Sequence, residues 1–254
     1  MTAERREPLS PQTVIRLASV LGLKDGAFIV GGQALNLWAE RYAPGWPDLI
    51  AYGPFTSKDL DYFGYQKAAR KLAVALGGRM VVPRPDDHTP NTALVIAAID
   101  GREIEIDFLS NVMGVRANAL ERDAVELLVS LPDGGSLAVP IMHPLHCLQS
   151  RIANVVGLGR KDEAALRQLA AAPIVVQAYI DEMLRLGEAR EAMTTIKALF
   201  DYLRADIDAR ACPDLPMRDP ALIVTAFLRD GRLDWRFRWF NLRAMRRKLG
   251  RRAH

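Results

Sequence analysis

Three aspartates in two short segments have the types and spacing of a metal site. Asp59 and Asp61 lie two residues apart, and Asp107 lies in the alternating segment Glu103-Ile-Glu-Ile-Asp-Phe-Leu. Residues two apart on a strand point to the same face, so Asp59 and Asp61 project together, and a neighbouring strand could bring Asp107 beside them. Close carboxylates repel one another unless a cation lies among them. Oxygen-only ligands suit Mg²⁺, with Mn²⁺ as the alternative, so these segments predict a magnesium site.

A glycine pair upstream adds a second chemical feature. Gly31 and Gly32 follow the apolar run 27–30 and precede a helical pattern over 33–42. Glycines let a backbone approach a ligand closely, and a helix start offers N–H groups to phosphate oxygens. Alone, the pair is a plain turn that matches neither common phosphate-binding loop. With carboxylates that could hold two metal ions, it indicates phosphoryl-transfer chemistry.

Alternating strands and short turns must position these residues. Predicted strands include 60–65, 79–82, 93–99 and 102–109, and the Asp100-Gly101 dipeptide favours a two-residue hairpin turn between the last two. Further strands are expected at 124–131 and 137–142, helices at 11–21, 33–42 and 66–76, and a long Pro/Gly-rich loop at 43–58. Helical patterns then occupy 145–156, 162–169, 174–186, 189–205, 220–229 and 235–249. The fold class is therefore α+β: a mixed sheet with flanking helices over residues 1–142, and an all-helical half over 143–254.

Composition favours a soluble cytoplasmic protein. Half of the 254 residues are hydrophobic and a quarter are charged, which is typical of a globular chain. The apolar runs are too short to cross a bilayer, and residues 1–11 lack the apolar core of a secretion signal. Cys147 and Cys212 lie far apart, so their spacing does not indicate a zinc site.

Positive charge is concentrated at the C-terminal end. Residues 229–254 contain ten basic and two acidic residues, whereas the rest of the chain has 24 basic and 28 acidic residues. Arginines alternate with aromatic residues across Arg229–Arg252. This pattern suits RNA, through phosphate pairing and base stacking. The favoured expectation, however, is an amphipathic helix whose aromatics pack on the helical half while its arginines meet water.

In this order the motifs resemble the nucleotidyltransferase superfamily, which shares the DNA polymerase β fold. The glycine turn of that family corresponds to Gly31-Gly32, and its acidic strand pair and third acidic residue to Asp59/Asp61 and Asp107. More narrowly, Gly31-Gly-Gln-Ala-Leu and Thr56-Ser-Lys-Asp-Leu-Asp-Tyr-Phe are similar to the abortive-infection (AbiEii-type) toxin nucleotidyltransferases. The resemblance covers roughly residues 25–170.

The resemblance implies transfer of a nucleoside monophosphate from a metal-bound NTP to an acceptor hydroxyl. Arg151 and Lys161 would contact the triphosphate, although the family commonly has a lysine where Arg151 lies, and an arginine differs in geometry. Ser57 and Lys58 are further candidates for nucleotide binding, and Lys58 could equally be a surface charge. The gap between Gly32 and Asp59 is longer than usual, so the 43–58 loop could reshape the substrate entrance.

Several alternatives remain open at this point. The toxin resemblance and the basic C-terminal end favour RNA or tRNA as the acceptor and an antitoxin protein as a partner. An antibiotic-type enzyme with a small acceptor, or a non-catalytic nucleotide- or RNA-binding module, could share the same fold. His143 and His146 precede and begin a helical segment, where capping or packing is favoured over zinc binding. No membrane partner is expected.

Overall fold

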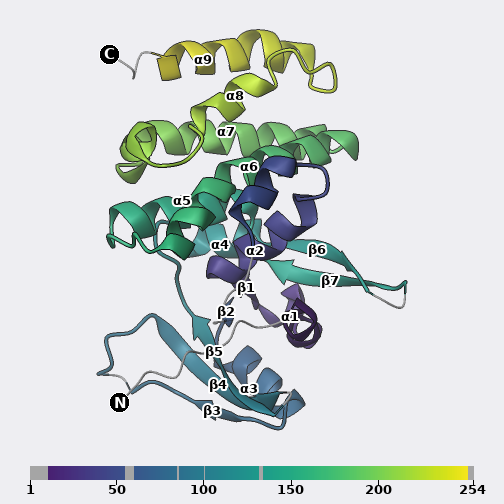
Figure 1. Ribbon diagram of the computed structural model, residues 1–254, viewed down its shortest axis with the longest axis vertical. Coiled ribbons are helices and arrows are strands. Elements are labelled where there is room, and N and C mark those ends of the chain that lie inside the picture. The colour runs from purple at the N-terminus through teal and green to yellow at the C-terminus, as the bar shows by residue number, and fades with distance from the viewer. Residues whose placement is uncertain (1–10, 55–59, 85, 100, 132–133, 251–254) are drawn as a thin grey trace. The chain divides into compact units, whose positions relative to one another are not determined.

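The computed structural model describes residues 11–54, 60–84, 86–99, 101–131 and 134–250. The chain divides into two compact units, Met1–Arg41 with Gly53–Ser150, and Tyr42–Tyr52 with Arg151–His254. The expected α+β class is confirmed: a seven-stranded mixed sheet with helices is followed by a largely helical C-terminal part (Figure 1). None of the described helices is both long and apolar enough to cross a membrane.

Mixed strand directions define the sheet of the first unit. Its strands, in chain order, are β1 (Phe28–Val30), β2 (Leu60–Phe63), β3 (Arg79–Val81), β4 (Asn91–Ile99), β5 (Arg102–Leu109), β6 (Val125–Ser130) and β7 (Ser136–Ile141). Their spatial order is β3-β4-β5-β2-β1-β7-β6. The β2–β5 and β1–β7 pairs are parallel, and the other four pairs are antiparallel. Strands distant in sequence, β2 and β5, are therefore direct neighbours.

Buried apolar residues and more exposed polar residues alternate along β5, which fixes the face of the sheet that carries polar side chains. Ile104, Ile106 and Phe108 are buried, and the intervening acidic residues are exposed or half-buried. The ring of Phe108 stacks on that of Tyr62 from β2, with centroids 5.3 Å apart. Because a slip of one residue would turn this apolar row toward water, burial locks the β2–β5 register.

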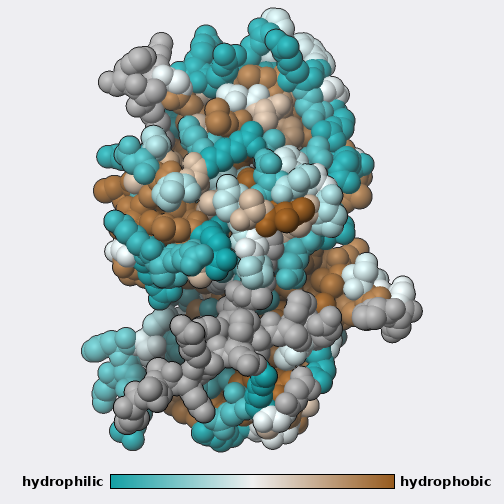
Figure 2. Space-filling view, viewed as in Figure 1, coloured by the Kyte–Doolittle hydropathy of each residue, from teal (hydrophilic) through white to brown (hydrophobic). Residues whose placement is uncertain are grey.

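Five helices begin in the first unit: α1 (Pro11–Ala18), α2 (Gly31–Tyr42), α3 (Gln66–Ala75), α4 (Ala117–Asp123) and α5 (Pro144–Val156). The α3 helix packs against β3 and β4 (Figure 1). The Trp38 indole on α2 donates a 3.0 Å hydrogen bond to the carbonyl of Met142, which joins this buried helix to the end of β7. On the face shown in Figure 2, the β6–β7 hairpin carries apolar side chains, and Leu128 is 61% exposed.

The second unit is built on two long helices, α6 (Glu163–Arg185) and α7 (Ala189–Ala205). Shorter elements complete it: η2 (Pro47–Tyr52), η3 (Asp208–Asp214), α8 (Ala221–Ala226), the π-helical segment η4 (Phe237–Leu242) and α9 (Arg243–Gly250). The η2 segment packs on α6 and buries Leu49. Nearby, the Tyr42 hydroxyl donates a 2.6 Å hydrogen bond to Glu182. The predicted loop at 43–58 therefore contains a helical turn, and its residues 55–58 lie outside the described ranges.

Two sequence predictions of helix position were wrong, and one helix was missed. The helix after β1 begins at Gly31 itself rather than at Gln33, and α4 was not predicted. The two helices expected at 162–169 and 174–186 form the single helix α6, with Pro173 inside it. An interior proline costs a helix about 3 kcal/mol, but Leu169–Val176 is buried throughout. Packing of that run outweighs the local penalty.

Gly78, between α3 and β3, lies tightly against the backbone of β4, and this contact can be tested. A Cβ atom there would collide with the backbone carbonyl of Ile96 and lie 2.9 Å from the Ala97 Cβ. Gly78→Ala should therefore destabilise the protein by about 1–3 kcal/mol, because the backbone of β4 cannot yield as a flexible side chain would. Gly231→Ala is the matched control, since its Cβ would meet nothing within 4 Å. Equal midpoints of thermal unfolding for the two variants would contradict this packing.

Candidate metal centre

Asp61 and Asp107 are direct neighbours across the parallel β2–β5 pair. They are register partners, and both are half-buried on the less apolar face of the sheet. Neighbouring strands lie about 4.8 Å apart, so the two carboxylates share one small region. The predicted juxtaposition of these two aspartates is thus found in the structure. Paired carboxylates in such an arrangement are suited to binding a hard divalent cation.

The glycine turn lies directly against one of these carboxylates. Val30 is the register partner of Asp61, and Gly31 follows it as the first residue of α2. Gly31 has φ +68°, and a Cβ there would lie only 2.7 Å from Asp61 Oδ2. Both the left-handed backbone and the close approach require glycine. The structure therefore brings the helix start of α2, which favours negative charge, to the carboxylate pair.

Asn91 is a site residue that sequence reasoning missed. Its Nδ2 donates a 2.6 Å hydrogen bond to Asp107 Oδ1. Asn91 is the register partner of Leu109, and the β4–β5 pairing shifts between Asn91 and Ala93. This irregularity at the start of β4 lets the amide reach Asp107. A sequence pattern of alternating residues gives no signal for such a shift, because it assumes unbroken pairing.

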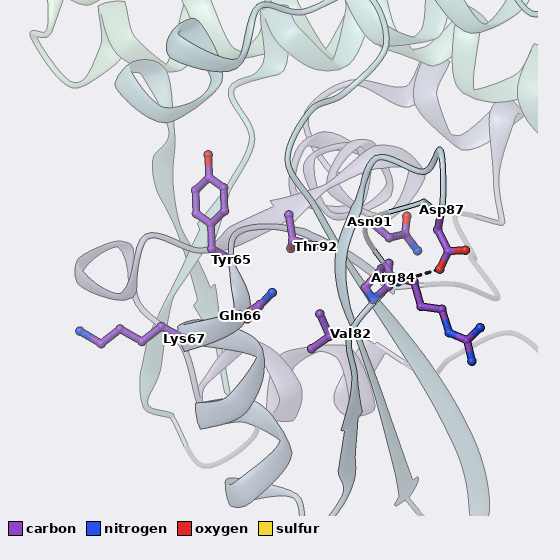
Figure 3. Close-up of a pocket in the computed structure, with 9 residues that line it drawn as sticks. Tyr65, Gln66, Lys67, Val82, Arg84, Asp87, Asn91 and Thr92 are labelled. Atoms are coloured by element: carbon purple, nitrogen blue, oxygen red, sulfur yellow. Dashed lines mark hydrogen bonds between the residues drawn. The ribbon is translucent and has the colours of Figure 1, made fainter.

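A cleft of about 470 Å³ lies at the start of β4, and one of its lining residues, Asn91, contacts Asp107. Its lining residues are Tyr65, Gln66, Lys67, Val82, Pro83, Arg84, Asp87, Asn91 and Thr92 (Figure 3). The Lys67 and Arg84 side chains extend in opposite directions. Asp87 Oδ2 accepts a 2.8 Å hydrogen bond from the Arg84 backbone N–H. Asn91 therefore joins the cleft to Asp107, while neither Asp61 nor Asp107 is among the residues that line it.

Several predicted site residues are not placed in this centre. Asp59, Ser57 and Lys58 lie outside the described residues. Among the described residues there is no group of three or more His, Cys, Asp or Glu that could hold a metal. Gly32 is the second residue of α2.

Arg151 and Lys161 both belong to the second compact unit. The Arg151 guanidinium donates a 2.8 Å hydrogen bond to Gln168 of α6, and Lys161 is exposed just before that helix. Their contact with a nucleotide stays a prediction.

His143 and His146 have structural roles, as the sequence favoured. His143 Nδ1 accepts a 3.1 Å hydrogen bond from the Leu145 backbone N–H at the start of α5. His146 Nε2 lies 3.1 Å from Asp123 Oδ2 at the end of α4. Burial lowers the pKa of His146, although its contacts with Gln149 and Asp123 favour the charged form. His146 is therefore neutral at physiological pH.

No known protein family, curated protein or solved structure matches the chain. The centre consists of two adjacent carboxylates, a glycine against one of them, and an amide on the other that also lines a cleft. Such a set has the oxygen ligands for a divalent cation and space for a ligand.

The neutral state of His146 predicts a pH dependence of stability. Because its folded-state pKa lies below the ordinary value of about 6.5, the unfolded chain binds more protons, and stability falls as pH drops through that value. Asp123 faces His146, but its own pKa is lowered below 3.8, so it does not titrate in this window. His146→Gln should show a smaller loss of thermal midpoint than wild type between about pH 7.5 and 5.5. An equal loss of thermal midpoint in His146→Gln and wild type would contradict this role of His146.

Proposed function

We propose that the protein is a metal-dependent nucleotidyltransferase that transfers a nucleoside monophosphate from an NTP to a hydroxyl of RNA. The observation that carries this proposal is the pairing of Asp61 with Asp107 on neighbouring strands, with the Gly31 backbone against Asp61. Carboxylates, a close glycine and a helix start together suit a metal-bound polyphosphate. The motif resemblance supports the same chemistry.

The donor set fits Mg²⁺ or Mn²⁺. Asp61 and Asp107 offer carboxylate oxygens from adjacent strands, and Asp59, two residues before Asp61, is the predicted third ligand. Mg²⁺ is usually held by one or two carboxylates together with waters and substrate phosphates. When bound, the metal would polarise the phosphoryl oxygens and neutralise developing charge.

The order of the strands suggests how two substrates share the centre. The glycine turn follows β1, on one side of the β2–β5 pair, and the cleft adjoins β4, on the other side. A triphosphate at the α2 start would therefore have the cleft opposite, where an acceptor could enter. Lys67 and Arg84 outnumber the single carboxylate of Asp87 among the cleft residues, which suits an acceptor that carries phosphates, such as RNA.

The proposed step is an in-line displacement at the α-phosphorus. The acceptor hydroxyl oxygen forms a bond to the α-phosphorus, the bond from that phosphorus to the bridging oxygen of the β-phosphate breaks, and pyrophosphate leaves. Asp107 accepts the hydroxyl proton, as a positioned carboxylate can. Asn91 fixes the orientation of the Asp107 carboxylate through its hydrogen bond to Oδ1, and the missing Cβ at Gly31 leaves room for the Asp61 carboxylate.

A labelling experiment tests the reaction directly. Purified protein is incubated with total cellular RNA, Mg²⁺ and each α-³²P-labelled NTP in turn, and labelled RNA is resolved on a denaturing gel. Asp61→Asn and Asp107→Asn should each lower labelling about 100-fold or more, because preorganised charge at the reacting phosphate is lost. Asp59→Ala should lower labelling to a similar extent. Glu103→Gln is the control, since Glu103 is an exposed carboxylate on the same strand as Asp107.

The outcomes separate the alternatives. Label that is retained in Asp61→Asn would refute the proposed centre. No label with any NTP would direct the search to proteins and small molecules as acceptors. If those also failed while nucleotide still bound the protein, the non-catalytic interpretation would replace this one.

Asn91 should act as a positioning residue. Asn91→Ala should raise the Mg²⁺ concentration for half-maximal labelling about 10- to 100-fold, the usual effect of removing a group that orients a metal ligand. Gln66→Ala is the control, because Gln66 lines the same cleft and no hydrogen bond to Asp107 is found for it in the described part of the chain. Equal Mg²⁺ dependence in the two variants would show that Asn91 only shapes the cleft.

A further inference from the structure

Large aromatic side chains are exposed near the C-terminal end of the second unit. Trp235, Trp239 and Phe240 have 58%, 55% and 62% of their surface exposed. The expectation that the aromatics of this segment pack on the helical half is therefore wrong for these three. Only Phe237 among the four is half-buried. Exposure of so much planar apolar surface on neighbouring residues needs a physical explanation.

Arginine side chains cover these rings. The Arg243 guanidinium carbon lies 3.4 Å from the Trp239 ring centroid, and that of Arg236 lies 5.4 Å from the Trp235 ring. The rings of Trp235 and Phe240 are 6.2 Å apart. We call these five residues, Trp235, Arg236, Trp239, Phe240 and Arg243, the aromatic–arginine surface. It lies across η4, whose π-helical winding is uncommon and occurs often at functional sites.

The positive charge around this surface is not neutralised. From Arg229 to Gly250 the chain has eight basic and two acidic residues. Arg232 forms ion pairs with Asp230 and Asp181. In the described part of the chain no ion pair is found for the exposed side chains of Arg236, Arg243, Arg246, Arg247 and Lys248. A row of unpaired cations beside exposed rings favours a polyanion as the partner.

The kind of apolar residue that is exposed narrows the choice of partner further. The aliphatic residues of the same segment, Leu233, Leu242, Met245 and Leu249, are all buried. A face that inserts into a membrane or a hydrophobic protein groove uses aliphatic residues as well as rings. Here the exposed large apolar side chains, Trp235, Trp239 and Phe240, are all aromatic. Planar groups beside phosphate-binding cations match the faces and backbone of unpaired bases.

We propose that the aromatic–arginine surface binds single-stranded nucleic acid, with bases stacked on Trp235, Trp239 and Phe240 and phosphates held by the surrounding basic side chains. This binding site is separate from the carboxylate centre and belongs to the second unit. It requires no catalysis, so it stands even if the proposed nucleotidyl transfer is wrong. Stacking tolerates any base, and the surface therefore binds without strong sequence preference.

Equilibrium binding of fluorescein-labelled 12-nucleotide oligo(U) and oligo(dT) to the full chain, measured by anisotropy, tests the proposal. The double variant Trp235→Leu/Trp239→Leu keeps apolar bulk but removes stacking, and it should bind about tenfold or more weakly. Trp235→Phe/Trp239→Phe keeps planar rings and should bind within a few-fold of wild type. Leu186→Ala/Ile207→Ala removes exposed apolar side chains elsewhere in the unit and should change nothing.

Salt dependence gives a second measurement. Arg246→Gln/Arg247→Gln should reduce the slope of log K against log salt by about 1.4, since each phosphate contact to a single strand contributes about 0.7. Affinity that is equal in the Leu and Phe double variants would overturn the stacking role. Association with anionic lipid vesicles but not with either oligonucleotide would overturn the proposal in favour of a membrane surface. Asp61→Asn should bind oligonucleotides as wild type does, which separates this result from loss of catalysis.

Discussion

Two carboxylates held side by side are the constraint on which the first unit depends. Asp61 and Asp107 are register partners on parallel strands, and two negative charges at that separation repel unless a cation or fixed dipoles lie close by. The chain places the start of α2 and the Asn91 amide against them. Both groups favour negative charge. Holding these two charges together lowers the stability of the sheet. The pair therefore indicates a function other than folding.

Rigid apolar packing on the opposite face keeps the pair in place. Tyr62 and Phe108 directly follow the two aspartates on their strands, and their rings stack behind them. Burial raises the pKa of the Tyr62 hydroxyl well above its usual range, so this side chain stays neutral in the core. Because the apolar rings and the carboxylates alternate on the same strands, a register shift of one residue would separate the aspartates only by exposing the rings. Packing energy thus offsets electrostatic repulsion at this point of the sheet.

Periodic patterns in the sequence predicted most of the strands and helices, but they did not predict the irregular features. The bounds of β5 and α7 agree with prediction, since alternation and helical spacing are unbroken there. Prediction missed the continuity of α6 through Pro173, because burial of the surrounding run is a tertiary effect. It also missed Asn91, whose contact with Asp107 depends on a local shift of strand pairing. The exposure of Trp235 and Trp239 was equally hidden, since spacing alone cannot tell an inward ring from an outward one.

The excess of basic residues over 229–254 suits the polyanionic acceptor that we propose. A cluster of carboxylates repels nucleic acid, and screening limits electrostatic attraction to about 8 Å at physiological salt. The proposed polyanionic acceptor would therefore gain its affinity from direct contact with cations and rings outside the carboxylate centre. The aromatic–arginine surface offers both, with the Arg243 guanidinium already stacked on Trp239. Binding energy from such remote contacts can be used to bring a reacting hydroxyl to a centre that by itself would repel it.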